Sequence, residues 1–477
     1  MVAQKITIEP VTRIEGHAKI TIRMNDDGTV NHAYLHVNEF RGFEKFCEGR
    51  MVFEMPYITP RICGICPVSH HLAAAKAGDA VMGCPPPRPA ELLRELMHMG
   101  QVVQSHGMHF FELAGPDLLL GFDRDPVTRN VVGLLQANAD LTVKAINLRK
   151  WGQEIIRILG GRRIHPVFAI PGGVNKALTP AERDTILAGM DEAIATTQIG
   201  IQIIKDWAYQ NAEDIAKFGV FPTGYFGLVT PQNSLELYQG QIRLTGRDGK
   251  QLEKFNASHY LDYIAEHVEN WSYLKFPYYK PMGFPGGVYR VGPLGRLNNS
   301  DQIDTPLANA EHKIWKTLNG GHPVENTLYY HYARLVEVLF AIERVGVLLS
   351  DPDVMSTDLL NTRHDFQGEG VGVIEAPRGT LLHHYFAKPN GQLERVNLIV
   401  STGHNNFAMC EAVDSVAKTY INGQEIREGL LNRVEAAVRA HDPCLSCSTH
   451  AIGQMPMVVN IVDNDGNLIQ TLSRGVD

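Results

Sequence analysis

Cysteine is scarce in this sequence, which has seven among 477 residues. So small and odd a number in a long chain argues against the disulfide framework of a secreted protein and favours a compartment where thiols stay reduced. Long apolar runs are also missing, since none approaches the roughly 20 residues that a membrane-spanning helix needs. The first residues lead directly into a strand-like pattern, without the apolar core of a signal peptide. We therefore expect a cytoplasmic protein with no membrane span.

Blocks of basic residues are absent as well. The formal net charge is −8, with 44 Lys and Arg against 52 Asp and Glu. Proteins that bind nucleic acid gather positive charge on one face, so nucleic acid is not an expected partner. Hydrophobic residues at 44% and charged residues at 20% are ordinary for a globular protein.

The periodicity of apolar residues predicts an α+β fold that is predominantly α, a helical core with β elements at both ends. Residues 5–40 alternate apolar and polar side chains around a turn signal at residues 25–28, which predicts a hairpin. From about residue 89 the period becomes helical. The clearest helix start is Thr179, with Pro180 next and Glu182 three residues after the cap. Further helices are expected at about 128–160, 180–218, 325–350, 410–421 and 425–440, and further hairpins around Asp248-Gly249, Asn390-Gly391 and Asn464-Asp465-Gly466.

Four of the seven cysteines form two CxxC pairs at opposite ends of the chain. Cys63 and Cys66 form the first pair, and Cys444 and Cys447 form the second, with 377 residues between Cys66 and Cys444. A CxxC pair presents two thiolates to one metal, so two pairs in a chain poor in cysteine predict a four-sulfur metal centre. Such a centre requires the two ends to meet in one packed body.

Spacing alone leaves the metal open. Structural zinc is the plain alternative, because sites with four cysteine ligands are common. Zinc sites usually organise a short local segment, however, and a chain of this size needs no metal for stability. An iron–sulfur cluster is a third reading, although its ligand runs usually keep three cysteines close together.

Several motifs together resemble the large, catalytic subunit of [NiFe] hydrogenases. The first CxxC lies in an RxCGxCxxxH run and the second in DPCxxCxxH, and residues 11–17 read VTRIEGH. Three further segments are similar to the bidirectional, NAD-reducing cytoplasmic branch of the family: 41–50, 271–277 and 375–380. The resemblance covers essentially the whole chain, and it implies a central helical bundle with peripheral β hairpins.

The resemblance assigns the four cysteines to a Ni–Fe centre. Cys63 and Cys444 would be terminal ligands of nickel, while Cys66 and Cys447 would bridge nickel to an iron that also carries cyanide and carbon monoxide. Soft thiolates suit a redox-active late transition metal. Dihydrogen is a very weak acid, so its cleavage needs a Lewis acid and a nearby base. The family pattern makes Cys444 the first base and Glu15 the next proton acceptor. Without the resemblance, Glu15 would read as a solvated carboxylate.

Other residues are implied around that centre. Arg378 and Asp442 would overhang the open metal position, where a guanidinium can polarise the substrate. Many membrane-linked relatives have Asp-His where this chain has Ser105-His106, which removes a carboxylate from this region. Glu44 and His450 are expected to be side-chain ligands of a magnesium ion. His70 is expected to form a hydrogen bond with a cysteine sulfur. The remaining cysteines, Cys47, Cys84 and Cys410, lack metal spacing and are expected to be packing thiols.

The last 27 residues resemble a processing signal. In the family a maturation endopeptidase cuts after the His of DPCxxCxxH, so residues 1–450 are expected to form a single domain and 451–477 an extension that is removed.

The chain has no further cysteine set for an electron-transfer chain and no dinucleotide fingerprint. We therefore expect two partners: a diaphorase module that carries flavin, iron–sulfur clusters and the NAD site, and a small iron–sulfur subunit. Three alternatives stay open: the same chemistry with NADP or a deazaflavin as acceptor, a non-catalytic scaffold like the related subunit of respiratory complex I, and a non-catalytic zinc-stapled subunit. The complex I relative lacks the four cysteines.

Overall fold

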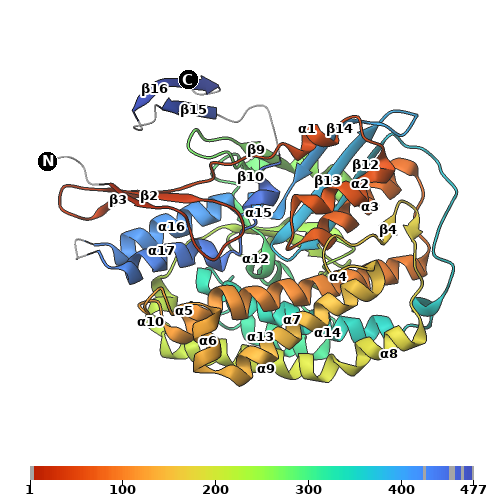
Figure 1. Ribbon diagram of the computed structural model, residues 1–477, viewed down its shortest axis with the longest axis horizontal. Helices are drawn as coiled ribbons and strands as arrows, with labels where there is room; N and C mark the ends of the chain where they lie inside the picture. Colours follow the sequence, from red (N-terminus) through yellow and green to blue (C-terminus); the bar gives the residue numbers. More distant parts are fainter. Residues whose placement is uncertain (1–4, 423–425, 451–456, 463–466, 475–477) are drawn as a thin grey trace.

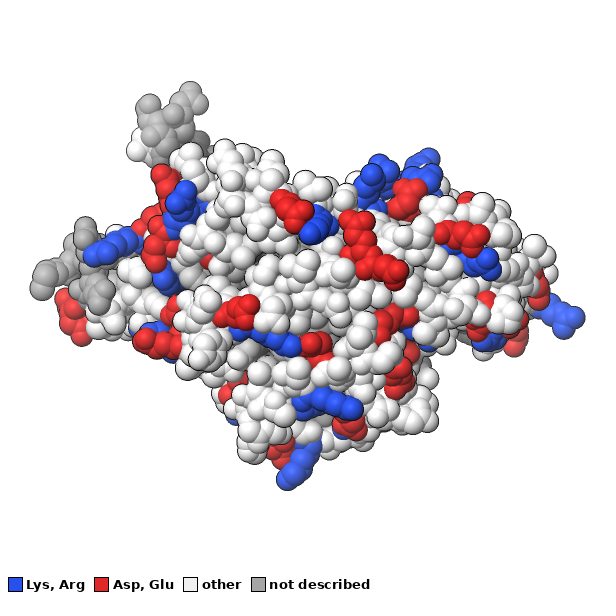
Figure 2. All heavy atoms as spheres, turned by 90° about the horizontal axis from the view of Figure 1, so that it is seen from below, with Lys and Arg blue, Asp and Glu red and all other residues white. Residues whose placement is uncertain are grey.

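The computed structural model describes residues 5–422, 426–450, 457–462 and 467–474. Long helices form one layer of the molecule, and small sheets with shorter helices cover it (Figure 1). On the face opposite the sheets, acidic and basic side chains are interspersed (Figure 2). No helix in these described ranges combines the length and apolar character that a membrane crossing requires.

Four long helices make up the centre of the bundle: α4 (Arg88–Met108), α7 (Ala139–Gly160), α9 (Met190–Gln210) and α14 (Tyr330–Ser350). Helix α4 is buried along nearly its whole length. It approaches α7 closely where glycines face each other, since a Cβ added at Gly152 would lie 2.6 Å from the Gly100 carbonyl oxygen. Small residues at such a crossing let two backbones pack at short range.

Shorter helices surround this bundle. Their bounds are α1 (Phe43–Cys47), α2 (Met55–Ile58), α3 (Pro67–Met82), α5 (Gly115–Leu120), α6 (Val131–Ala137), α8 (Pro180–Ala188), α10 (Ala212–Lys217), α11 (Tyr260–Tyr263), α12 (Gly292–Asn299), α13 (Pro306–Trp315), α15 (Ser401–His404), α16 (Asn406–Tyr420), α17 (Glu428–Ala440) and α18 (Leu445–Ser448). A π-helical turn, His109–Ala114, continues α4 toward α5.

Two of the sheets contain three antiparallel strands each. The first contains β1 (Lys5–Ile8), β2 (Lys19–Met24) and β3 (Val30–His36) and packs on α16. The second contains β12 (Glu369–Ala376), β13 (Gly379–Ala387) and β14 (Leu393–Ile399) and packs on α3. A four-stranded sheet has the order β11 (Tyr289–Arg290), β6 (Gly224–Val229), β7 (Gln241–Thr245), β8 (Gln251–Phe255). Three two-stranded pairs are β4 (Ala169–Ile170) with β5 (Gly173–Val174), β9 (Ile264–His267) with β10 (Phe276–Tyr279), and β15 (Met457–Val462) with β16 (Leu468–Arg474).

Most predicted elements are present, with three corrections. The predicted helix 128–160 is two helices, because Asn138 ends α6 and its side chain caps α7. The predicted helix 180–218 is three, although its start is confirmed, since Thr179 and Glu182 form a capping box. The coarse picture of a helical core with β elements at both ends was incomplete, because β6–β8 and β12–β14 lie in the middle of the chain. The hairpins predicted there at Asp248-Gly249 and Asn390-Gly391 are confirmed, since they join β7 to β8 and β13 to β14. The last predicted turn, at 464–466, lies outside the described residues, although β15 and β16 pair on either side of it.

Candidate metal centre

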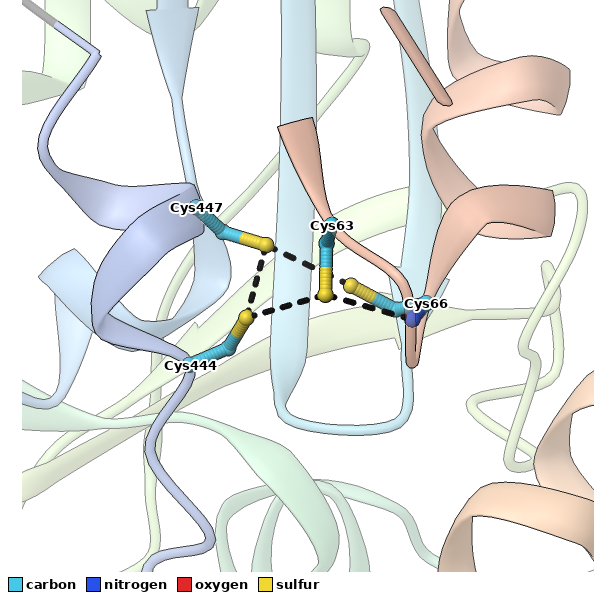
Figure 3. Close-up of side chains that lie close together, drawn as sticks. All are labelled: Cys63, Cys66, Cys444 and Cys447. Carbon is cyan, nitrogen blue, oxygen red and sulfur yellow. Dashed lines mark hydrogen bonds between the residues drawn. The ribbon is translucent and has the colours of Figure 1, made fainter. Parts of the chain in front are cut away.

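Four cysteine sulfurs converge in the interior, as the spacing predicted (Figure 3). All four lie within 4.8 Å of one another. The Sγ atoms of Cys63 and Cys444 are 3.2 Å apart, those of Cys66 and Cys447 3.5 Å, and those of Cys444 and Cys447 2.8 Å. Each residue is at most 4% exposed. Four soft donors at this spacing fit one transition-metal centre.

Each CxxC pair lies where a turn leads into a helix. Cys63 ends the short 3₁₀ turn Thr59–Ile62, and Cys66 is the residue just before α3, whose first position is Pro67. Cys444 precedes α18 in the same way, and Cys447 lies within it. The N-terminus of the 16-residue α3, which carries partial positive charge, lies directly beside Cys66.

The electrostatics of the cluster call for a cation. Burial raises the pKa values of the Cys444 and Cys447 thiols well above the ordinary value. Hydrogen bonds from the neighbouring thiols, that of Cys444 first, lower the pKa of Cys63 well below its ordinary value. Holding four thiolates together at this spacing requires a bound metal, because like charges this close in a buried site repel strongly.

Glu15 lies directly against the second CxxC. Its Oε2 atom is 3.0 Å from the Cys444 Sγ and accepts a hydrogen bond from the Ser446 backbone N–H at 3.1 Å. The backbones also join, since Leu445 N–H donates to the Glu15 carbonyl at 3.1 Å. Two residues earlier, Arg13 has a φ of 56°, a strained value for a residue with a side chain. The N-terminal and C-terminal segments thus fix each other at the centre.

Arg378 and Asp442 form a buried pair above the same cluster. The Arg378 Nε donates to the Asp442 carbonyl at 2.6 Å, and its Nη2 donates to the Oδ1 carboxylate oxygen at 3.1 Å. Burial alone would lower the pKa of Arg378, but Asp442 and the cluster sulfurs raise it well above its ordinary value. Within the described residues, Arg378 Nη1 and Asp442 Oδ2 have no hydrogen-bond partner although both are buried. These two atoms are available to a group bound at the cluster.

Glu44 and His450, the residues predicted to hold magnesium, are in contact with each other. His450 Nδ1 is 3.0 Å from Glu44 Oε1, and the same oxygen accepts from Leu398 N–H at 2.7 Å. Burial alone would raise the pKa of Glu44, but His450 and the Leu398 amide outweigh it and lower the pKa. One oxygen and one nitrogen donor fit part of a magnesium shell, whose other positions usually hold carbonyl oxygens and water.

The expectation for His70 was wrong. Its Nδ1 lies 3.1 Å from His383 Nε2, and no hydrogen bond in the described part of the chain joins it to a cysteine. His383 Nδ1 in turn lies 2.6 Å from the hydroxyl of Tyr385. Ser105, where many relatives have Asp, is buried, and its Oγ has no partner among the described residues.

The other three cysteines lie outside the cluster, as expected. Cys47 and Cys84 are buried and Cys410 is half-buried. Burial raises the pKa values of these thiols to about 12, about 11 and about 12, respectively. They remain protonated near neutral pH and act as packing groups.

Two supporting features were not predicted from the sequence. Gln101 and Gln104 of α4 both donate through Nε2 to the Ile65 carbonyl, each at 2.9 Å. Asp117 binds Arg13 through one oxygen and Arg439 through the other, both at 2.5 Å. The only local signal for the glutamines is their spacing, since two residues three apart on a helix lie side by side.

The fold and the cluster together define a metalloprotein whose two chain ends close a four-thiol centre. A family model described as Nickel-dependent hydrogenase matches residues 41–120 and 227–450, and one described as HoxL-like matches residues 5–40. The chain belongs to the nickel-dependent hydrogenase family. This membership confirms the resemblance and the fold class expected from the sequence.

Individual relatives extend along the whole chain. The beta subunit of the NAD-reducing hydrogenase HoxS from Cupriavidus necator is 43% identical, over 99% of this chain and 100% of the relative. A relative from the F420-non-reducing hydrogenase vhc of Methanococcus voltae is 42% identical, over 98% and 100%. A crystal structure of an NAD⁺-reducing [NiFe]-hydrogenase in the H₂-reduced state matches with a TM-score of 0.91 and 46% identity, covering 94% of this chain and 99% of its own.

Proposed function

We propose that this chain is the catalytic subunit of a [NiFe] hydrogenase that interconverts dihydrogen with protons and electrons, coupled through partner subunits to NAD⁺ reduction. One observation carries the catalytic part of the proposal: the buried four-sulfur cluster has the Glu15 carboxylate 3.0 Å from one of its sulfurs. Membership of the nickel-dependent hydrogenase family supports it.

The four cysteines would hold the Ni–Fe centre. Cys63 and Cys444 would bind the nickel, Cys66 and Cys447 would also bind the iron, and cyanide and carbon monoxide would be the remaining iron ligands. When bound, the centre supplies the Lewis acidity and redox capacity that heterolytic cleavage of dihydrogen needs. The soft donor set supports this assignment over a hard cation.

The protein's part in the reaction is to move the proton. The Cys444 sulfur is the proposed first base, and its contact with Glu15 Oε2 at 3.0 Å gives the proton a direct exit. The Ser446 amide holds the Glu15 carboxylate in place. A hydrogen bond in position before the transfer needs no reorganisation when the proton moves.

Arg378 and Asp442 are proposed to act on the substrate side. Their mutual bonds fix the guanidinium, while Nη1 stays free of partners among the described residues. A fixed cation in a buried site stabilises developing negative charge more strongly than one in water. The pair would polarise bound dihydrogen and order water for proton transfer.

Coupling to NAD⁺ is proposed from the relatives, since no residue described above binds a dinucleotide. The Cupriavidus necator relative and the matching crystal structure are both described as NAD-reducing. Electrons would leave through a small iron–sulfur subunit to a diaphorase module containing flavin, iron–sulfur clusters and NAD. Relatives described as F420-non-reducing are of similar identity, so the coupling needs its own test.

The natural complex tests both parts of the proposal. We expect it to reduce a redox dye with hydrogen, and to reduce NAD⁺ with hydrogen faster than NADP⁺ or a deazaflavin. Dye reduction without NAD⁺ reduction would leave the hydrogenase proposal standing and remove the coupling. Loss of both in a metal-loaded complex would contradict the function itself. Identifying the co-purifying subunits by mass spectrometry would show whether the diaphorase module is present.

Removal of residues 451–477 by a maturation endopeptidase is proposed as a further step. The family model ends at His450, and the solved structure leaves uncovered about as much of this chain as that tail. Thr449 and His450 already bind the body, because their carbonyls accept from Arg41 and Glu44 backbone N–H groups. The β15–β16 hairpin lies apart from it (Figure 1). Glu44 and His450 are proposed to bind magnesium in the processed form.

A further inference from the structure

A hydrogen-bond relay reaches the Cys63 sulfur from two glutamines of α4. It consists of the Gln101 and Gln104 amides, the Ile65 carbonyl, the Cys66 N–H and the Cys63 Sγ. Both amides donate to the Ile65 oxygen at 2.9 Å, and a carbonyl oxygen has two lone pairs to accept them. The Cys66 N–H donates to the Cys63 sulfur at 3.4 Å, and the Ile65 N–H donates to it at 3.2 Å.

The second link of this relay is covalent. The Ile65 carbonyl and the Cys66 N–H belong to the same peptide group, so hydrogen bonds accepted by its oxygen polarise its N–H. Polarisation along a chain of hydrogen bonds strengthens each later bond, most of all in a buried and weakly screened site. Gln101 is fully buried and Gln104 is 6% exposed, so water does not compete strongly for either amide.

The two glutamine hydrogen bonds to the Ile65 carbonyl do more than hold the loop between Cys63 and Cys66 in place. One amide would suffice to hold the Ile65 carbonyl, yet two side chains converge on it. Gln101 also leaves its own Oε1 buried with no partner among the described residues, a cost that folding alone would not favour. The loop needs outside support, because Gly64 at its apex is exposed and a Cβ there would meet nothing within 4 Å.

We propose that Gln101 and Gln104 are positioning residues that tune the electron donation of the Cys63 thiolate through this relay. The proposal rests on the proposed function, in which Cys63 is a nickel ligand. Hydrogen bonds to a ligating sulfur withdraw electron density and stabilise the reduced metal. The two glutamines therefore raise the reduction potential of the nickel.

The test replaces each amide by an apolar side chain of similar size. Gln101→Met, Gln104→Met and the double variant are purified in the natural complex, with Gln302→Met as a control. Gln302 makes the same kind of bond, but to Ser234 Oγ. Three quantities are measured: nickel per chain, melting temperature, and the nickel midpoint potential followed by electron paramagnetic resonance.

We expect the double variant to keep its nickel and to shift the midpoint to lower potential. At the wild-type midpoint, its ratio of oxidised to reduced nickel should rise about tenfold, which corresponds to about 59 mV for a one-electron couple. Each single variant should raise that ratio about two- to threefold, because the other amide still donates, and the control should leave it unchanged. A merely structural role would change nickel content or melting temperature without moving the midpoint.

Several outcomes would overturn the proposal. A wild-type midpoint in the double variant, with nickel retained, removes the relay while leaving the proposed function intact. If the double variant does not retain nickel, the single variants decide, and wild-type midpoints in both of them overturn the relay. A wild-type complex without nickel would contradict the proposed function first.

Discussion

Glu15 shows at the scale of one residue what sequence and structure each contribute. Its identity as a site residue came from a motif resemblance, because a lone acidic residue near a strand carries no chemical signal. In the structure the Glu15 carboxylate lies 3.0 Å from the Cys444 sulfur, and this contact is the basis of its proposed role. The chain positions involved are 429 residues apart, so no local pattern could have predicted that distance.

Glu15→Gln tests the proton route. The amide has the shape of the carboxylate but cannot accept a proton, so hydrogen oxidation should fall by about 10²–10⁴-fold, the usual contribution of a general base. Nickel and iron contents should stay at wild-type levels. Glu39→Gln, a substitution of an exposed carboxylate bonded to His17, is the matched control and should keep full activity. Full activity in Glu15→Gln would remove Glu15 from the route.

Asp117 is a residue on which both ends of the chain depend. Burial alone would raise its pKa, but Arg439 and Arg13 outweigh burial and lower the pKa below the ordinary value of 3.8. A lowered folded-state pKa stabilises the fold above the unfolded-state pKa, and that stability is lost as pH falls below about 3.8. The carboxylate thus holds the Glu15 loop against α17 at neutral pH.

Asp117→Asn should lower the free energy of unfolding by about 3–5 kcal/mol near neutral pH, because the buried Arg439 and the half-buried Arg13 lose their counter-charge. The loss should shrink as pH falls below about 3.8, where Asp117 of the unfolded wild-type chain begins to be protonated, and it should vanish below the lower pKa of the folded state. Urea unfolding at several pH values measures both effects. Equal losses at neutral and acidic pH would show that the carboxylate charge is not what Asp117 contributes.

At the scale of elements, features determined by residues close together in the sequence were predicted more accurately than features determined by contacts between distant residues. The start of α8 was predicted because a capping box involves residues three apart. The turns of the interior hairpins β7–β8 and β13–β14 were predicted in the same way. The strands themselves were harder to recognise, since β6 is buried along its whole length and seven of the nine residues of β13 are buried. A strand buried on both faces shows no alternation, so its pattern cannot be told from that of a buried helix.

The packing of β12 on α3 gives a prediction at this scale. A Cβ added at Gly372 would lie 2.1 Å from the Ala73 carbonyl oxygen, so Gly372→Ala must push the strand away from α3, the helix that follows Cys66. We expect a loss of about 1–3 kcal/mol in the free energy of unfolding, the usual range for overpacking. Gly403→Ala, where the nearest atom would be an ordinary 3.9 Å away, should change stability far less. Denaturant titration compares the two variants, and equal stabilities would contradict the close packing.

At the scale of the whole molecule, the metal centre and the fold depend on each other. The two CxxC pairs come from opposite ends of the chain and meet only in the folded state. The sequence was enough to predict this closure, because four thiols in a cysteine-poor chain have few other uses. It could not predict Gln101, Gln104 or Asp117, whose roles arise from how distant elements approach one another.

The proposed processing step should depend on the metal. Chain purified from cells grown without nickel should retain residues 451–477, and chain from nickel-replete cells should end at His450. Mass spectrometry of the intact protein measures the difference of 27 residues. A tail still present on a nickel-loaded, active enzyme would contradict the step.

The most direct test of the central claim is elemental analysis of the purified native complex for nickel, iron and zinc. The account predicts about one nickel per copy of this chain, with iron beyond that of the partner clusters, and no nickel in a Cys63→Ser variant. One zinc per chain with no nickel, in a complex whose chain ends at His450, would contradict it and make the four cysteines a structural staple.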